Sequence, residues 1–261
     1  MNIIAIIPAR MGSSRFPGKP LADIHGLPTV LHVALRTRLA RCLDAVYVAT
    51  CDQEIADVCT AAGVPAIMTS PAHERCSDRT AEALLHIEEA SGHRADIVVM
   101  VQGDEPMITP DMIEAAVAPL LHEASVQVVN LMEEMASTQE FEDPNEVKVV
   151  VDAAGDALYF SREPLPSRKK GATTVPMCKQ VCIIPFRREA LLHFNDLPET
   201  PLERIESVDM LRLLEHGEKV RMVAVPHRTF SVDTPEDLRR VRELMRKDPL
   251  FAAYYPRMEH I

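Results

Sequence analysis

IIAIIPARMGSSRFPGKP, residues 3–20, is the stretch that decides the fold, because an apolar run leads without a break into a loop rich in glycine and cations. The β-branched residues at 3–7 predict a buried strand. The other members of the pattern are three similar runs, at 46–49, 65–68 and 97–101, and four segments of helical period, at 29–41, 53–62, 78–90 and 110–122. Strands that alternate with helices indicate a parallel sheet with helices on both faces. The sequence therefore predicts an α/β fold with a doubly wound, mostly parallel sheet.

The pattern changes after about residue 126. Two strand-like runs at 147–151 and 157–160 flank a turn that contains Gly155, which predicts a β-hairpin. Further expected elements are a strand at 181–185, helices near 187–194 and 202–216, a strand at 220–225 and a last helix that begins at 233–237. No repeat or long linker interrupts the chain. We therefore expect one domain over residues 1–261 with a β-rich insertion at about 126–190.

The composition excludes several classes of protein. With 261 residues, 47% of them hydrophobic, the chain is long enough to bury a full core. Its formal net charge of -11 argues against a nucleic-acid partner, which would require a basic face. No apolar run approaches the length of about 18 residues that a membrane span requires, and the N-terminus lacks the features of a signal peptide. We therefore expect a cytoplasmic protein without a membrane span.

The six cysteines are scattered along the chain, and only Cys178 and Cys182 lie close together. No second pair and no histidine doublet supplies the spacing of a zinc site. Because a cytosol keeps thiols reduced, we expect reduced cysteines in the core rather than zinc ligands or disulfides.

The loop at residues 8–20 is dense in Gly, Ser, Arg and Lys. Ligands of open parallel sheets collect where strands end, so a loop of this composition is well placed to hold phosphates. Neither common phosphate-loop fingerprint is present: Pro20 follows Gly18-Lys19 where GxxxxGK[ST] requires Ser or Thr, and GxGxxG is absent. The alternative interpretation of this loop is a solvated basic turn.

Two aspartates follow other predicted strands. Asp104 comes after the run at 97–101, and Asp233 opens the last predicted helix. A carboxylate beside phosphates is repulsive unless a cation lies between them, and Mg²⁺ typically takes one or two carboxylates together with phosphate oxygens. Asp104 and Asp233 are therefore candidate Mg²⁺ ligands. For each of them, the alternative is an ordinary N-cap of the following helix.

Four segments carry a resemblance that spans almost the entire chain in order and spacing. They are IIPARMGSSRFPGKPL at 6–21, VQGDEPMI at 101–108, NEVKVVVDAAGDALYFSR at 145–162 and VDTPEDL at 232–238. Together they closely resemble the 3-deoxy-manno-octulosonate (KDO) cytidylyltransferase, or CMP-KDO synthetase, family. Any one of these segments alone would be only suggestive, but the set is highly specific.

The resemblance implies a Rossmann-like nucleotidyltransferase fold whose β-rich arm forms a homodimer. It also implies a Mg²⁺-dependent enzyme that transfers CMP from CTP to a small sugar acid and releases pyrophosphate. By matching position it implies CTP contacts from Arg10, Ser13, Arg15, Lys19 and Arg79, Mg²⁺ ligation by Asp104 and Asp233, sugar contacts from Gln102, Arg162, Gln180 and Asp209, and catalytic roles for Lys19, Arg10 and Asp104. In-line attack of a sugar hydroxyl on the α-phosphorus requires such positioning and charge neutralisation.

Three places differ from the usual pattern of the family. Cys76 stands where a glycine is usual, Gln180, Cys182 and Ile184 replace His, Gly and Tyr, and Met210 replaces Gln. A site built to bond a hydroxyl rejects analogues that lack it by as much as ~10⁴ to 10⁵. These differences leave the acceptor open between KDO, an 8-amino or deoxy relative of KDO, a nonulosonic acid and a phosphonate.

Two other functions stand as alternatives. A nicotinamide oxidoreductase could use a similar sheet, but the absent GxGxxG counts against it. A non-catalytic nucleotide-binding protein would not need the pair Asp104 and Asp233 beside Lys19. The assignment fails if the two aspartates lie too far apart to share an ion, or if Lys19 turns away from them.

Overall fold

The chain divides into two units, and the computed structural model describes residues 1–13, 15–171 and 174–255. The first unit combines Met1–Glu114 with Thr229–Ile261, and the second is Ala115–Arg228. The predicted insertion at about 126–190 falls inside the second unit. One domain over the whole chain stays a prediction.

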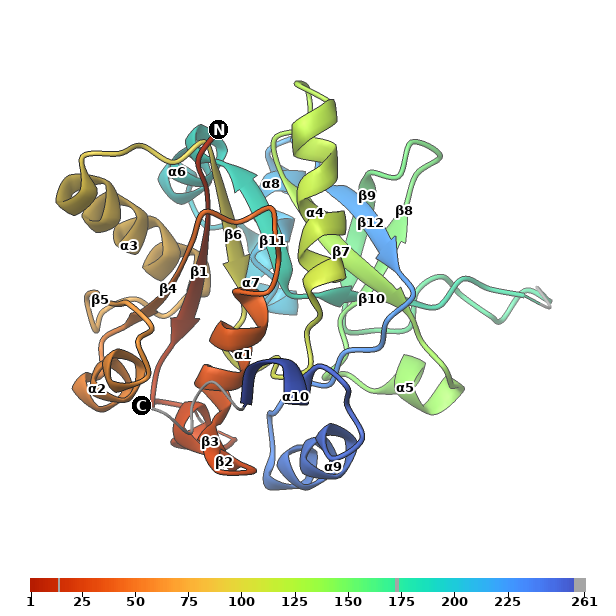
Figure 1. Cartoon of the computed structure of the whole chain (residues 1–261). Coiled ribbons are helices and arrows are strands. Elements are labelled where there is room, and N and C mark those ends of the chain that lie inside the picture. Colours follow the sequence, from red (N-terminus) through yellow and green to blue (C-terminus); the bar gives the residue numbers. More distant parts are fainter. Residues whose placement is uncertain (14, 172–173, 256–261) are drawn as a thin grey trace. The chain divides into compact units, whose positions relative to one another are not determined.

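The first unit is built on four parallel strands in the order β6-β1-β4-β5. Their bounds are β1 (Ile3–Ala9), β4 (Ala45–Thr50), β5 (Ala66–Met68) and β6 (Ile97–Val101). Every residue of β1 and β6 is buried, as expected for parallel strands covered on both faces. Figure 1 shows β4, β1 and β6 side by side. Because β1 lies between β4 and β6, the order of the strands reverses there, and a crevice opens at the carboxyl end of β1.

The predicted helices of this part are present. They are α1 (Thr29–Thr37), α2 (Gln53–Ala61) and α3 (Cys76–Ser91), together with α4 (Pro110–His122), which begins in the first unit and continues into the second. The α/β prediction is therefore confirmed, and the bounds agree within a few residues except at the end of α1. That helix stops at Thr37 instead of residue 41, because the chain continues in tight turns such as Leu39 N–H to Arg36 O.

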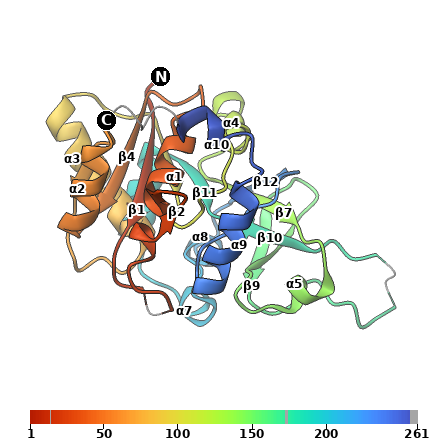
Figure 2. The ribbon, with the colours of Figure 1, turned by 60° about the horizontal axis from the view of Figure 1, so that its bottom comes forward.

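The last part of the chain packs beside the residues that follow the first loop. This region contains the short helix η1 (Lys19–Leu21), the two-stranded β2 (Asp23–Ile24) and β3 (Leu27–Pro28), and the helices α9 (Pro235–Met245) and α10 (Phe251–Tyr254). Ile24 joins Val232 and Val241 in one buried apolar cluster. Figure 2 shows α10 beside α1, where the Tyr254 hydroxyl lies 2.8 Å from His32 Nδ1. The sequence predicted α9 but not the smaller elements.

The second unit contains a mixed sheet in the order β12-β7-β10-β8-β9. The bounds are β7 (Val129–Glu134), β8 (Lys148–Val151), β9 (Ala157–Ser161), β10 (Cys178–Val181) and β12 (Arg221–Val225). The pair β7 and β12 is parallel, and the other pairs are antiparallel. The predicted hairpin is confirmed as β8 and β9, with Gly155 at a φ of 83° in its turn. The remaining helices and strands are α5 (Thr138–Glu142), α6 (Arg188–Asp196) and the elements described next.

Two elements of this unit were wrongly predicted as continuous, because each is divided into two in the structure. The strand expected at 181–185 is two strands, because β10 ends at Val181 and β11 (Ile183–Arg187) begins after Cys182. The helix expected at 202–216 is likewise two helices, α7 (Pro201–Glu206) and α8 (Met210–Glu215). Ser207 separates them in the left-handed conformation with a φ of 54°. The apolar period continues across both breaks, so the period alone does not reveal them.

The six cysteines are all free. Cys59 is buried and the other five are half-buried, so the prediction of core thiols holds for Cys59 alone. Among the residues that the structure describes, no helix is both long enough and apolar enough to cross a membrane.

Candidate active site

The loop after β1 folds back onto its own start. The Met11 amide donates to Asp52 Oδ2 at 2.7 Å, and the Gly18 amide donates to Met11 O at 3.0 Å. Gly18 has a φ of 76°, a conformation that glycine adopts without the steric cost paid by other residues. This closure places Lys19 at the first position of η1, beside the end of β1.

The segment after β6 lies directly against the end of β1. A Cβ atom on Gly103 would be 2.8 Å from Pro8 O, so only a glycine permits this approach. The close contact holds Gln102 and Asp104, the two neighbours of Gly103, beside the first loop.

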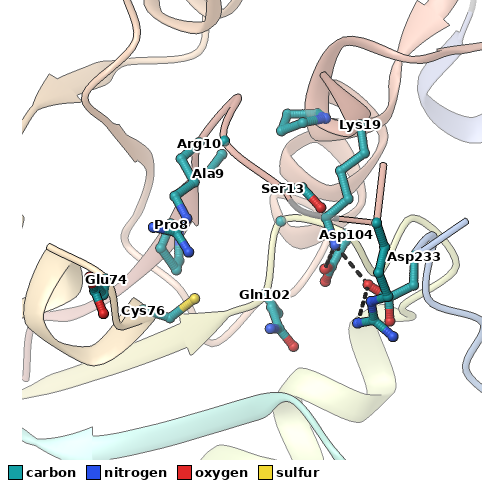
Figure 3. A pocket seen from close by; sticks show the side chains of 14 residues that line it. Pro8, Ala9, Arg10, Ser13, Lys19, Glu74, Cys76, Gln102, Asp104 and Asp233 are labelled. Atoms are coloured by element: carbon teal, nitrogen blue, oxygen red, sulfur yellow. Dashed lines mark hydrogen bonds and ion pairs between the residues drawn. The ribbon is translucent and has the colours of Figure 1, made fainter. Parts of the chain in front are cut away.

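Asp104 and Asp233 meet although they are distant in the sequence. The Val232 amide donates to Asp104 O at 2.8 Å, which joins the two backbones. Lys19 Nζ donates to the carboxylate of Asp104 and lies 2.9 Å from Asp233 Oδ1. Figure 3 shows Lys19 between the two aspartates. Arg15 adds a second cation, with Nη2 3.0 Å from Asp233 Oδ1.

Neither aspartate serves as the helix N-cap that was its alternative interpretation. The N-cap of α9 is Thr234, whose hydroxyl accepts from the Asp237 amide at 3.2 Å in a reciprocal capping box. The next helix after Asp104 begins only at Pro110. Both carboxylates are therefore available to Lys19 and to a ligand.

The charges of this cluster are strongly coupled. Burial acts to lower the pKa of Lys19, but the negative charges of Asp104 and Asp233 outweigh it and raise that pKa. The pKa of Asp104 is raised as well, because the burial of its carboxyl outweighs the attraction of Lys19. Asp104 Oδ1 is buried and has no hydrogen-bond partner among the residues described. A buried carboxylate with an unused oxygen gains most from an additional cation.

These side chains line an open cavity of about 220 Å³. Figure 3 shows Arg10 away from the cluster of Lys19, Asp104 and Asp233. Arg10 is exposed and has no hydrogen bond within the described part of the chain. The full lining is Pro8, Ala9, Arg10, Gly12, Ser13, Arg15, Lys19, Pro20, Glu74, Cys76, Gln102, Gly103, Asp104 and Asp233. Three cations thus border a cavity at the carboxyl ends of β1 and β6, which suits a polyphosphate.

The residues present fit a magnesium ion that is shared with phosphates. Within residues 1–13, 15–171 and 174–255, no three His, Cys, Asp or Glu side chains converge as a complete metal site. Asp104 and Asp233 supply two carboxylates, one with an unpartnered oxygen. Mg²⁺ commonly takes one or two carboxylates and completes its shell with substrate phosphates and water. The donor set therefore matches Mg²⁺ bound together with a nucleotide.

The structure brings most of the predicted residues of the first unit together. Seven of them line the cavity: Arg10, Ser13, Arg15, Lys19, Gln102, Asp104 and Asp233. Arg79, predicted to contact CTP, does not line it. Its side chain is 2% exposed and donates to Thr69 Oγ1 at 2.5 Å and to His73 O at 3.2 Å. In this structure Arg79 holds the segment that leads into α3.

The predicted sugar residues Arg162, Gln180 and Asp209 belong to the second unit. Arg162 is half-buried. Its Nε donates to the backbone O of Glu206 at 2.6 Å, and its backbone amide donates to Glu206 Oε2 at 2.8 Å. Asp209 occupies the N-cap position of α8 without a side-chain cap bond.

Gln180 has a fixed amide orientation. Its Nε2 donates to Asn130 Oδ1 at 2.6 Å. Asn130 is 0% exposed, and its Nδ2 donates to Val181 O at 2.7 Å and Leu131 O at 3.1 Å. Because the Asn130 amide is committed in this way, only its oxygen faces Gln180, and the Gln180 carbonyl oxygen is left for a ligand.

Some residues that line the cavity were not predicted from the sequence. Glu74 was not singled out, and Cys76 was noted only for replacing a glycine, yet both line the cavity. The available signal was their position just before and at the start of α3, after a strand of the same sheet. Ile184 and Met210, proposed from sequence to affect the choice of sugar, are 3% and 0% exposed and belong to the core.

Comparison with known proteins gives consistent matches over nearly the whole chain. The family model described as cytidylyltransferase matches residues 4–220. The 3-deoxy-manno-octulosonate cytidylyltransferase of Syntrophotalea carbinolica is 44% identical over 254 residues, which cover 94% of this chain and 99% of that protein. The protein of the same name from Geobacter metallireducens is 46% identical over 253 residues, 93% of this chain and 97% of its own.

A solved structure agrees with these relatives. It is a CMP:2-keto-3-deoxy-manno-octonic acid synthetase complexed with CTP, 39% identical to this chain, with a TM-score of 0.86. The alignment covers 95% of this chain and 99% of that one. The match to the family model, at residues 4–220, spans parts of both units and every predicted site residue except Asp233.

Proposed function

The chain belongs to the 3-deoxy-manno-octulosonate cytidylyltransferase family, and on that premise we propose how its own residues carry out the reaction. The enzyme transfers CMP from CTP to 3-deoxy-manno-octulosonate (KDO) and releases pyrophosphate. The alignment covers 99% and 97% of two relatives' own length. KDO is the acceptor that we propose, in place of the other acids that the sequence left open as acceptors.

The observation that supports this mechanism most directly is the position of Lys19. Its ammonium lies between the carboxylates of Asp104 and Asp233 at the edge of a cavity bordered by Arg10 and Arg15. Phosphoryl transfer requires groups that hold the phosphates and neutralise the charge that develops on their oxygens. Such a cluster of cations and carboxylates is what a triphosphate and its metal ion require.

On the nucleotide side, Arg10, Ser13 and Arg15 bind the phosphates of CTP. Lys19 donates to phosphate oxygens and offsets negative charge on the leaving pyrophosphate. Asp104 and Asp233 would hold Mg²⁺, which when bound would supply further positive charge to the phosphate oxygens. The side chains of the first loop then keep the α-phosphorus in line with the attacking hydroxyl.

On the acceptor side, the guanidinium of Arg162 holds the carboxylate of KDO, because a planar fork of N–H donors matches a carboxylate. The carbonyl oxygen of Gln180 accepts from a sugar hydroxyl. Gln102 and Asp209 complete the polar contacts to the sugar. We place these four roles on the match to the family, supported for Arg162 and Gln180 by the donors and the acceptor that their side chains leave available.

Two positions that the sequence analysis expected to differ from the family pattern do not argue against KDO as the acceptor. Ile184 and Met210 lie in the apolar core, so their change affects packing rather than a direct contact with the sugar. A homodimer and a cytoplasmic location are also proposed, on the family resemblance alone. Sedimentation tests the first, and cell fractionation tests the second.

The decisive experiment measures pyrophosphate release from CTP and KDO with and without Mg²⁺. We expect release only when all three are present, and at least about 10²-fold slower release by Asp104→Ala. Binding of CTP without release of its pyrophosphate when KDO is present would support a non-catalytic nucleotide-binding protein instead. Release without any divalent cation would contradict the role of the two aspartates.

A further inference from the structure

Lys148, on β8, is a buried cation that the mechanism above does not use. Its side chain is 0% exposed. Its Nζ donates to Asp143 O and Glu146 O, both at 2.8 Å, and to Arg162 O. An ammonium has three N–H donors, so these three backbone carbonyls use all of them. Lys148 forms no ion pair with a carboxylate among the described residues.

Burying the ammonium of Lys148 without an ion pair is unfavourable in free energy, in contrast to the ammonium of Lys179 on the neighbouring strand. Lys179 is paired with Lys148 across β10 and β8, and its ammonium lies 3.2 Å from Glu133 and 3.0 Å from Glu146. Lys148 has no such ion pair, and burial lowers its pKa although the charges of nearby Asp143 and Glu146 oppose the shift. An apolar side chain would fill this space without burying a charge. The ammonium therefore serves the backbone segments that it joins.

Both joined segments lead to Arg162. Lys148 holds the carbonyl of Arg162 itself, and it holds the carbonyls on either side of Pro144. The Pro144 carbonyl in turn accepts from Arg162 Nη1 at 2.9 Å. The lysine thus fixes both the backbone from which the guanidinium extends and the loop on which it rests.

The guanidinium keeps donors for a ligand. Glu206 O accepts from Nε at 2.6 Å and Pro144 O accepts from Nη1, while Nη2 has no hydrogen bond to any residue that the structure describes. A carboxylate could therefore be bound through the terminal nitrogens. Its position would be set by the two carbonyls that hold the other donors.

We propose that Lys148 is a positioning residue that acts through Arg162 on the carboxylate of the acceptor sugar. The inference rests on the proposed role of Arg162 in binding KDO. Lys148 itself touches neither substrate. Its effect should therefore appear in the binding of KDO and not in the binding of CTP.

The first test is Lys148→Met, assayed for KM with each substrate and for thermal stability. We expect the KM for KDO to rise about tenfold, the size of effect that follows from misplacing one charge-assisted hydrogen bond. The KM for CTP should change less than about twofold. Equal changes in both KM values would overturn the proposal. If Lys148→Met does not fold, Lys148→Arg retains the charge and donors in a different geometry and should give the same selective effect, reduced in size.

Arg187→Met is the matched control. Arg187 also donates to three backbone carbonyls in this unit, those of Leu120 at 2.7 Å, Glu123 at 3.2 Å and Val126 at 2.9 Å. None of these carbonyls contacts Arg162. Its loss should lower stability and leave the KM for KDO unchanged, and a selective rise equal to that of Lys148→Met would overturn the assignment.

A double-mutant comparison separates this inference from the proposed function. In an Arg162→Met background, Lys148→Met should add no further change in the KM for KDO, because the group through which it acts is gone. A further tenfold rise would mean that Lys148 acts independently. If Arg162→Met alone leaves the KM for KDO unchanged, the proposed role of Arg162 fails. If Arg162→Met raises that KM and Lys148→Met does not, only the inference about Lys148 fails.

Discussion

The ammonium of Lys19 lies 2.9 Å from Asp233 Oδ1 and also contacts the carboxylate of Asp104, so one lysine bridges the two residues proposed to hold Mg²⁺. An ammonium and a divalent cation cannot occupy the same place between two carboxylates. The triphosphate offers Lys19 an alternative set of acceptors. Binding of the nucleotide and binding of the metal ion are therefore expected to favour each other.

Lys19→Met tests this competition without any turnover. With the ammonium removed, Asp104 and Asp233 lack their shared cation and should attract a divalent ion more strongly. We expect Mn²⁺ to bind the variant about tenfold more tightly than the wild type in the absence of nucleotide, as measured by electron paramagnetic resonance. Weaker or equal Mn²⁺ binding would show that Lys19 does not compete for the site.

Asp104→Ala should abolish most turnover and spare the fold. The pKa of Asp104 is raised by burial, so its charge contributes little to stability and its removal leaves a hydrated cavity edge. We expect kcat to fall at least about 10²-fold, with an unchanged or higher melting temperature. Asp44→Ala is the control, because Asp44 accepts from the Ile3 amide at 2.8 Å and does not line the cavity. That variant should lose stability while keeping kcat.

The sequence predicted the sheet and its phosphate loop because both are local signals. The buried run of β1 and the glycines and cations after it are adjacent in the chain, and the alternation of strands and helices is visible without tertiary contacts. The meeting of Asp104 with Asp233 is different in kind. It depends on the hydrogen bond from the Val232 amide to Asp104 O and on the close approach at Gly103. The family resemblance implied that the two aspartates meet, but it predicted neither of these contacts.

Other features could not be predicted from the sequence, for similar physical reasons. An arginine in a sequence motif gives the same pattern whether it contacts a ligand or the protein itself. The fold buries Arg79 against the segment before α3, and its contact with CTP stays a prediction. The break at Ser207 requires a left-handed residue that is not glycine, which sequence patterns rarely indicate. Only tertiary packing separates these cases.

The stability of the first unit should fall in mild acid because of His32. Burial lowers the pKa of this imidazole to about 4, from 6.5 in the unfolded chain. The folded state therefore binds fewer protons between these values, and the stability from neutral His32 is present above pH 6.5 and lost as the pH falls toward 4. At about 1.4 kcal/mol per pKa unit, the loss is ~3 kcal/mol.

Protonation would also turn Nδ1 from an acceptor into a donor, which removes the hydrogen bond from the Tyr254 hydroxyl. Urea unfolding at several pH values, compared between the wild type and His32→Gln, isolates this contribution. The difference in unfolding free energy between the two proteins should shrink as the pH falls. Parallel curves would mean that His32 does not titrate in this range.

Asn130→Leu tests whether the buried amide orients Gln180 for the sugar. The substitution removes the acceptor of Gln180 Nε2, so the glutamine amide can turn and no longer presents its carbonyl oxygen alone. It also leaves Val181 O without its donor, which should lower stability by about 1–3 kcal/mol. We expect the KM for KDO to rise about three- to tenfold while the KM for CTP stays constant.

A loss of stability alone would not raise the KM for KDO while sparing the KM for CTP. Measuring stability together with the two KM values therefore separates an orienting role of Asn130 from a structural one. In a Gln180→Ala background, Asn130→Leu should still lower stability but should no longer change the KM for KDO, because no amide remains to be oriented. If Asn130→Leu leaves the KM for KDO unchanged, or raises it equally in both backgrounds, Asn130 and Gln180 serve only to join β7 and β10.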